Sequence, residues 1–96
     1  MSYTPQAARD LALRALPHIA TDDELVEALL AMTGLRPQDL RQAVSDPDFA
    51  LSLLDFLLED DQRVLRFAQA AGIRPEEVMS ARIALAGPGS HGWEAD

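Results

Sequence analysis

The segment FALSLLDFLL, residues 49–58, is apolar apart from Ser52 and Asp55, and it is the best guide to the architecture of the chain. The polar residues in this segment and at its two ends follow one another at spacings of four, three and four, so on a helix they share one stripe of roughly 60°. A helix with so narrow a polar stripe either lies at the centre of the fold or is partly covered by another chain. The polar positions are Asp48, Ser52, Asp55 and Glu59.

Helix-start and helix-stop residues divide the rest of the chain into further helices. A Thr or Asp that can accept hydrogen bonds from the first backbone N–H groups, or a Pro, marks each start. Gly34 and Gly72 are expected to end helices in the left-handed conformation. No stretch alternates with period two, so we predict a compact all-α bundle of about six short helices with the fourth in the centre. The starts are Thr4-Pro5, Thr21 or Asp22, Arg36-Pro37, Asp46-Pro47, Asp60 or Asp61, and Pro75.

Two places interrupt this regular pattern. Pro17 lies within the apolar spacing of the first helix, and we expect a kink or an early end there, because proline removes a donor and crowds the preceding turn. The run GPGS at 87–90 ends the sixth helix. Residues 1–86 are therefore predicted to form a single helical domain, and residues 87–96 a flexible C-terminal tail. Trp93 in that tail is either a loosely packed aromatic or a docking anchor.

Residues 21–44 and 59–82 are similar without gaps at an offset of 38 residues. The clearest match pairs GLRP at 34–37 with GIRP at 72–75. The pattern indicates two similar three-helix units, each covering apolar faces of the other, as neighbours do in helical repeat proteins. The same pattern is also a good way to encode any helical hairpin, so duplication and independent use of one hairpin pattern both stay open.

Composition excludes several classes of function. The chain has 96 residues and a formal net charge of −8, from 16 acidic and 8 basic residues, and it has no cysteine. Without cysteine there are no disulfides, thiolate zinc sites or cysteine nucleophiles. The acidic balance repels nucleic acid and anionic membrane surfaces. We expect no signal peptide and no membrane span, and hence a cytoplasmic protein.

No catalytic, cofactor-binding or metal-binding residue can be assigned from the sequence, and we predict a protein that is not an enzyme. The acidic clusters at 22–24, 46–48 and 59–61 lack the alternating ligands and turn glycine of a calcium loop. Each lies at a helix start, where carboxylates cap backbone N–H groups. His18 has no nucleophile placed beside it, and His91 lies in the tail.

One pattern is typical of DNA-binding proteins. Ala68-x3-Gly72-x5-Val78 has the spacing of small residue, turn glycine and core aliphatic residue found in helix-turn-helix motifs. However, Glu76 and Glu77 begin the helix that would enter the major groove, where they would lie near phosphates. A weak DNA-binding regulator is therefore the alternative hypothesis, and a purely structural hairpin is the simpler interpretation.

Several segments together resemble a known family. They are MTGLxPxDL at 32–40, DPDF at 46–49, LDFLL at 54–58, FA at 67–68 and GIxPE at 72–76. They are similar to a family of short all-helical bacterial proteins, found mainly in alphaproteobacteria, that is known only as a domain of unknown function. The similarity covers roughly residues 7–85, and Pro17 departs from the family's first helix. The family has no assigned activity, so the resemblance implies a fold and no functional residues.

The best functional hypothesis is a non-enzymatic protein-interaction or adaptor module that binds a protein partner or associates with itself. The apolar fourth helix supports it, because part of such a helix can form a groove or a dimer face. Arg36 and Arg74 occupy equivalent positions of the repeat. They either pair with nearby carboxylates or hold an acidic segment of a partner, and we name them as candidate partner-binding residues. A small-ligand carrier with an apolar pocket is a third possibility.

Overall fold

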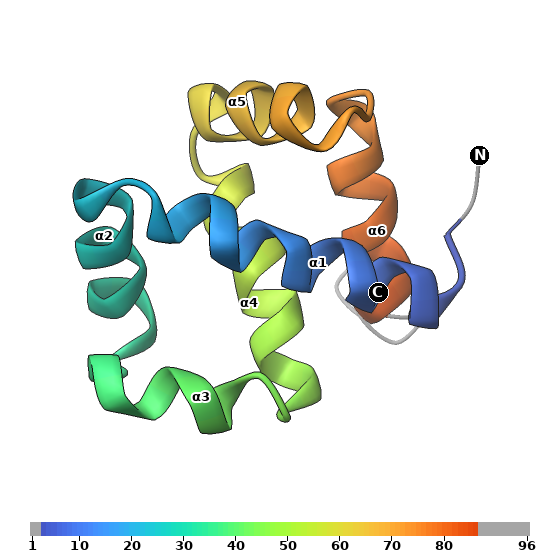
Figure 1. Cartoon of the computed structure of the whole chain (residues 1–96). Coiled ribbons are helices and arrows are strands. Elements are labelled where there is room, and N and C mark those ends of the chain that lie inside the picture. The colour runs from blue at the N-terminus through green and yellow to red at the C-terminus, as the bar shows by residue number, and fades with distance from the viewer. Residues whose placement is uncertain (1–2, 87–96) are drawn as a thin grey trace, which may run out of the picture.

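The computed structural model describes residues 3–86, and all its regular elements are helical (Figure 1). The predicted all-α fold is confirmed, whereas the predicted tail at 87–96, with Trp93, lies outside the described residues. The third helix is reduced to a 3₁₀ turn and a single α-helical turn. The elements are α1 (Pro5–Ala20), α2 (Asp23–Thr33), η1 (Pro37–Asp39), α3 (Leu40–Ala43), α4 (Pro47–Leu58), α5 (Asp61–Ala71) and α6 (Glu76–Ala86).

The predicted central position of α4 is confirmed. In Figure 1, α1 crosses in front of α4 near the middle of the molecule, and both helices pack against α6. The side chain of Phe56 is 0% exposed, and its α4 neighbours Leu53 and Leu57 are equally buried. Burying a Leu or Phe side chain stabilises the folded state by about 1.5–3 kcal/mol, so α4 is a main source of stability. The core consists of Ala8, Leu11, Ala12, Ala15, Ile19, Leu29, Phe49, Ala50, Leu53, Leu54, Phe56, Leu57, Phe67, Val78 and Ala81.

Side-chain caps begin α1, α2, α4 and α5 where the sequence predicts them. The hydroxyl of Thr4 accepts a hydrogen bond from the backbone N–H of Ala7 at 3.1 Å, at the start of α1. Asp22, Asp46 and Asp60 each accept one from the N–H two residues later, at 2.9, 2.9 and 2.8 Å. Each such cap is typically worth about 1 kcal/mol. The chain therefore encodes its helix starts locally, independently of the packing that follows.

The two similar halves of the sequence have matching structures over their middle helices. The bounds of α2, shifted by 38 residues, are those of α5 (23 to 61 and 33 to 71). Both helices end at a left-handed glycine, Gly34 with φ 75° and Gly72 with φ 72°. The halves then diverge, because the cap at Asp46 starts α4 three residues after α3 ends, whereas α6 continues to Ala86.

The first helix continues past Pro17 to Ala20, so the expected early end is wrong. Pro17 lies on the exposed side of α1, and Ile19 in the same turn is buried in the core. The hydroxyl and the N–H of Thr21 both donate to the carbonyl oxygen of His18, at 2.7 and 3.2 Å, and close the final turn. Burial of Ile19 and this closure outweigh the single backbone donor that proline removes.

Candidate functional site

Arg36 and Arg74 lie at matching places, immediately before η1 and shortly before α6. The Nε atom of Arg36 is 3.2 Å from Oδ2 of Asp39, and that of Arg74 is 3.8 Å from Oε2 of Glu77. The same carboxylates accept the backbone N–H groups of the two arginines, at 3.1 and 2.9 Å. Their side chains are 70% and 66% exposed, so both guanidinium groups face solvent while pairing with a local carboxylate.

The structure does not bring these two arginines together. The turn before η1, with Arg36, and the turn before α6, with Arg74, lie at opposite corners of the molecule in Figure 1. One short segment of a partner would therefore reach one arginine but not both. A role for Arg36 or Arg74 in holding an acidic partner stays a prediction.

The helix-turn-helix pattern corresponds to α5 and α6, which are joined by a turn and meet at a corner in Figure 1. Ala68 and Val78 are buried at 2% and 0% exposure, and Gly72 between them has the left-handed backbone that the turn requires. The outer side of α6 carries exposed Glu76 and Met79. The cation of this helix, Arg82, pairs with Asp55 of α4. The helix that would enter a DNA groove thus presents acidic and apolar groups.

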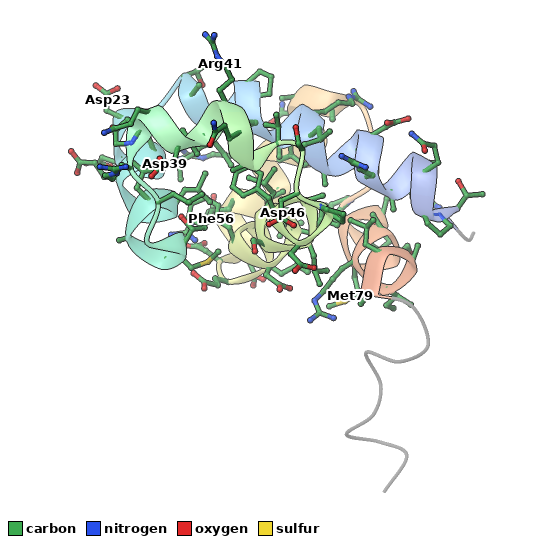
Figure 2. All side chains as sticks on the ribbon, turned by 90° about the horizontal axis from the view of Figure 1, so that it is seen from below. Asp23, Asp39, Arg41, Asp46, Phe56 and Met79 are labelled. Atoms are coloured by element: carbon green, nitrogen blue, oxygen red, sulfur yellow. The ribbon has the colours of Figure 1, made fainter. Side chains whose placement is uncertain are left out.

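In each acidic cluster, one carboxylate accepts a backbone N–H and caps a helix. A hollow of about 580 Å³ between α2, α3 and α4 has a mixed apolar and polar lining that includes Asp39, Asp46 and Asp48, of which Asp39 and Asp46 are labelled in Figure 2. Asp39 already holds the backbone and side chain of Arg36, and Asp46 already caps α4. Within residues 3–86, no three His, Asp or Glu side chains form a group that could hold a metal ion.

A smaller hollow of about 270 Å³ lies where the starts of α2 and α5 meet. Apart from His18, its lining consists of residues paired by the 38-residue offset, namely Asp22 with Asp60, Glu24 with Gln62, Leu25 with Arg63, and Ala28 with Arg66. The two halves of the chain therefore face each other across it. Arg63 is engaged elsewhere, because its Nη1 donates to the Phe56 carbonyl at 2.9 Å and its guanidinium lies 4.0 Å from the ring of Phe56.

The apolar fourth helix does not itself provide the docking face expected from the sequence. Its apolar residues are buried by other helices of the same chain, and only Leu51 and Leu58 are partly exposed. Figure 2 shows Phe56 within the body of the molecule, whereas Met79 is at its edge on α6. The large exposed apolar side chains lie on other helices, with Met32 on α2 and the rest on α5 and α6.

A groove between α5 and α6 carries two of the large exposed apolar side chains, Leu65 and Met79, and Ile83 lies one turn further along α6. Leu65 of α5 is 48% exposed, and Met79 and Ile83, one turn apart on α6, are 46% and 45% exposed. The hollow at its centre has a volume of about 380 Å³. Its lining, which defines the α5–α6 groove below, consists of Leu58, Asp61, Val64, Leu65, Pro75, Glu76 and Met79.

The charges of the α5–α6 groove are acidic. Asp61 and Glu76 are the first residues of α5 and α6, where the helix dipole favours a carboxylate. Among the described residues, neither of them has an ion-pair partner. Two arginines of the flanking helices pair with other carboxylates, Arg63 with Glu59 at 3.3 Å and Arg82 with Asp55, and Arg66 of α5 lines the smaller hollow between α2 and α5. The groove thus combines an apolar floor with two unpaired negative charges.

Tyr3 joins the start of the chain to α6. Its hydroxyl donates to Oε1 of Glu77 at 2.6 Å, and the other carboxylate oxygen accepts the Arg74 N–H. The hydrogen bonds from Tyr3 and Arg74 hold the pKa of the Glu77 carboxyl below its ordinary value of 4.5. The same hydrogen bond, together with partial burial, raises the pKa of the Tyr3 hydroxyl above its ordinary value of 10.0.

Sequence reasoning did not identify the α5–α6 groove. Leu65, Met79 and Ile83 have the same helical spacing as core residues, and only the packing of α5 and α6 decides which apolar face stays outside. The signal that could have found the groove is the composition of α6, where apolar residues occur on all sides of the helix. A helix of this kind needs a cover on more than one side.

Comparison with known proteins gives a family and no activity. A family model described as a protein of unknown function (DUF3572) matches residues 5–88. This match confirms the resemblance to an uncharacterised family. No curated protein and no solved structure matches the chain. Within residues 3–86, no helix has both the length and the apolar character that crossing a lipid bilayer requires.

Proposed function

The chain belongs to the DUF3572 family of proteins of unknown function, and we propose that it is a non-enzymatic protein-interaction or adaptor module. The observation that carries this proposal is the α5–α6 groove, where Leu65 and Met79 are each nearly half exposed beside a hollow of about 380 Å³. Adjacent exposed apolar side chains with a polar rim are typical of protein docking surfaces.

The chemistry of the described residues supports a binding role better than a catalytic one. The carboxylates Asp22, Asp46 and Asp60 are engaged by backbone N–H groups. The ring of His18 lies 5.6 Å from the ring of Phe67, packed at the edge of the core. We place the module in the cytoplasm, because a chain without cysteine fits a reducing compartment.

The proposal is tested by affinity capture from a lysate of the source organism, quantified by mass spectrometry. The tagged wild-type chain is compared with Leu65→Ser/Met79→Ser, and with Met32→Ser, which removes an exposed apolar side chain from α2. The proposal expects a protein that is enriched with the wild type and with Met32→Ser and lost with the double variant. Equal recovery with all three chains, or no enrichment with any, would refute it. An Arg36→Ala/Arg74→Ala variant tests in parallel whether those arginines hold the partner.

Weak DNA binding is the second candidate, because a left-handed turn at Gly72 joins α5 to α6 and the pattern residues Ala68 and Val78 on either side of it are buried, as in a helix-turn-helix unit. The net charge of −8 and the acidic start of α6 weigh against it. An electrophoretic shift assay at low salt tests it with random-sequence duplex DNA, since non-specific affinity is strongest there. A shift that disappears with Arg74→Ala would favour DNA binding, and no shift would end this candidate.

A further inference from the structure

The shape of the α5–α6 groove narrows the kind of partner that fits. Both of its walls are helices, and no described residue lies in a strand that could accept an added strand. Recognition between helices typically places the apolar face of an amphipathic helix in such a groove, with anchors at intervals of three or four residues. Met79 lines the groove, and Ile83, which is also exposed and lies one turn or about 5–6 Å further along α6, continues the apolar row beyond the lining residues.

The charges that line the groove further restrict the kind of partner that fits. Asp61 and Glu76 line it without an ion-pair partner among the described residues. Arg63 and Arg82 pair with other carboxylates, and Arg66 lines the hollow between α2 and α5 instead. A partner that placed acidic groups here would bring like charges together in a partly dry site, which costs binding energy. A partner with Lys or Arg beside its apolar face would instead supply the missing counter-charges.

The same charges disfavour two other occupants. A second copy of this chain has a net charge of −8 and would bring its own acidic residues to the contact. An anionic membrane surface would be repelled by the same carboxylates. The apolar floor and the acidic lining are therefore complementary to a partner that has an apolar face flanked by Lys or Arg.

We propose that the α5–α6 groove binds an amphipathic helix of a partner protein that carries Lys or Arg on the flanks of its apolar face. This inference rests on the proposed interaction function and adds the chemistry of the partner. The apolar anchors of the partner helix cover Leu65 and Met79, and its basic flanks pair with Asp61 and Glu76.

The test uses three peptides of about 18 residues, or about five helical turns. The first is built from Leu and Lys with Leu at helical spacing, the second has Glu in place of Lys, and the third has the first composition in an order without an apolar helical face. Each is titrated calorimetrically into the full chain at low and physiological salt. Protein NMR spectra locate the residues that the bound peptide perturbs.

Binding of the first peptide alone is expected, with perturbations centred on Leu65 and Met79. Leu65→Ser/Met79→Ser should weaken this binding about tenfold or more, because two apolar contacts are lost. Asp61→Asn/Glu76→Gln should weaken it about three- to tenfold, in a salt-dependent manner. The matched control, Asp10→Asn/Glu27→Gln, removes the same charge from exposed positions of α1 and α2 and should change the affinity less than about twofold. Circular dichroism of each variant verifies that it is folded.

Four outcomes overturn the inference. Equal weakening by the Asp61/Glu76 pair and the Asp10/Glu27 pair would mean a general attraction to an acidic chain. Equal binding of the Lys and Glu peptides through Leu65 would mean that the groove takes helices of any charge, which leaves the interaction function intact. A dimer seen by sedimentation that Leu65→Ser/Met79→Ser dissociates would mean that a second copy covers the groove. Absence of binding by every peptide also refutes the inference, while lysate capture tests the interaction function separately.

Discussion

Replacing Gly72 with alanine should destabilise the protein by roughly 1 kcal/mol, and the same change at Gly34 should cost about as much. Both residues end a helix with positive φ, 72° and 75°. A Cβ atom at either position would meet no heavy atom within 4 Å, so the substitution creates no clash. The cost is then the left-handed backbone itself, about 1–2 kcal/mol for a residue other than glycine. Alanine offsets about 0.4–1 kcal/mol of this by restricting the unfolded chain.

Urea unfolding followed by far-UV circular dichroism measures this cost. In thermal unfolding followed by the same signal, the melting temperature should fall by about 4–8 °C for each substitution. Because the two turns lie apart in the molecule (Figure 1), the double variant should lose the sum of the two costs, roughly 2 kcal/mol. Asparagine, which tolerates the left-handed region, is the control at each position and should cost less. If alanine leaves the free energy of unfolding unchanged at both sites, the left-handed conformation of the two glycines is refuted. A loss above about 3 kcal/mol would instead mean that the added Cβ atom clashes with a neighbouring atom.

Two further predictions concern α6 and the contrast between core and groove. Tyr3→Phe should raise the pKa of Glu77 toward its ordinary 4.5, as measured by NMR titration, because the strongest hydrogen bond to the carboxylate is lost. Since the folded-state pKa of Glu77 is lowered, its contribution to stability is present above pH 4.5 and is lost as the pH falls through the folded-state pKa. Tyr3→Phe should therefore flatten the acid branch of the stability profile, and an unchanged acid branch would contradict this assignment. Phe56→Ala should cost about 3–5 kcal/mol in urea unfolding, but Leu65→Ala less than about 1 kcal/mol, because Leu65 is half exposed. Equal losses of stability for the two variants would mean that Leu65 is buried in the core and does not line an exposed groove.

The helix starts could be predicted because the physics that sets them is local. A capping aspartate needs only the next few backbone N–H groups, so Asp22, Asp46 and Asp60 specify their helices whatever packs around them. The central place of α4 was equally accessible, since its narrow polar stripe leaves no other arrangement in a single chain. The early end expected at Pro17 was wrong for the opposite reason. Its local preference is overridden by burial of Ile19 on the other side of the turn, a contact between helices that the sequence does not show.

The groove lay beyond sequence reasoning because it depends on which of two apolar faces of α6 is buried. Val78 and Ala81 form one face and Met79 and Ile83 another, and both have helical spacing. The crossing of α6 over α1 and α4 buries the first face, and the second remains in solvent. Burying Met79 instead would turn Val78 outward and leave as much apolar surface uncovered. An uncovered face is therefore a consequence of the composition of α6, and packing decides only that this face adjoins Leu65 and the acidic starts of α5 and α6. That adjacency makes the surface a groove with a charge preference, which is why the partner's flanking charges, more than its apolar residues, are the decisive test.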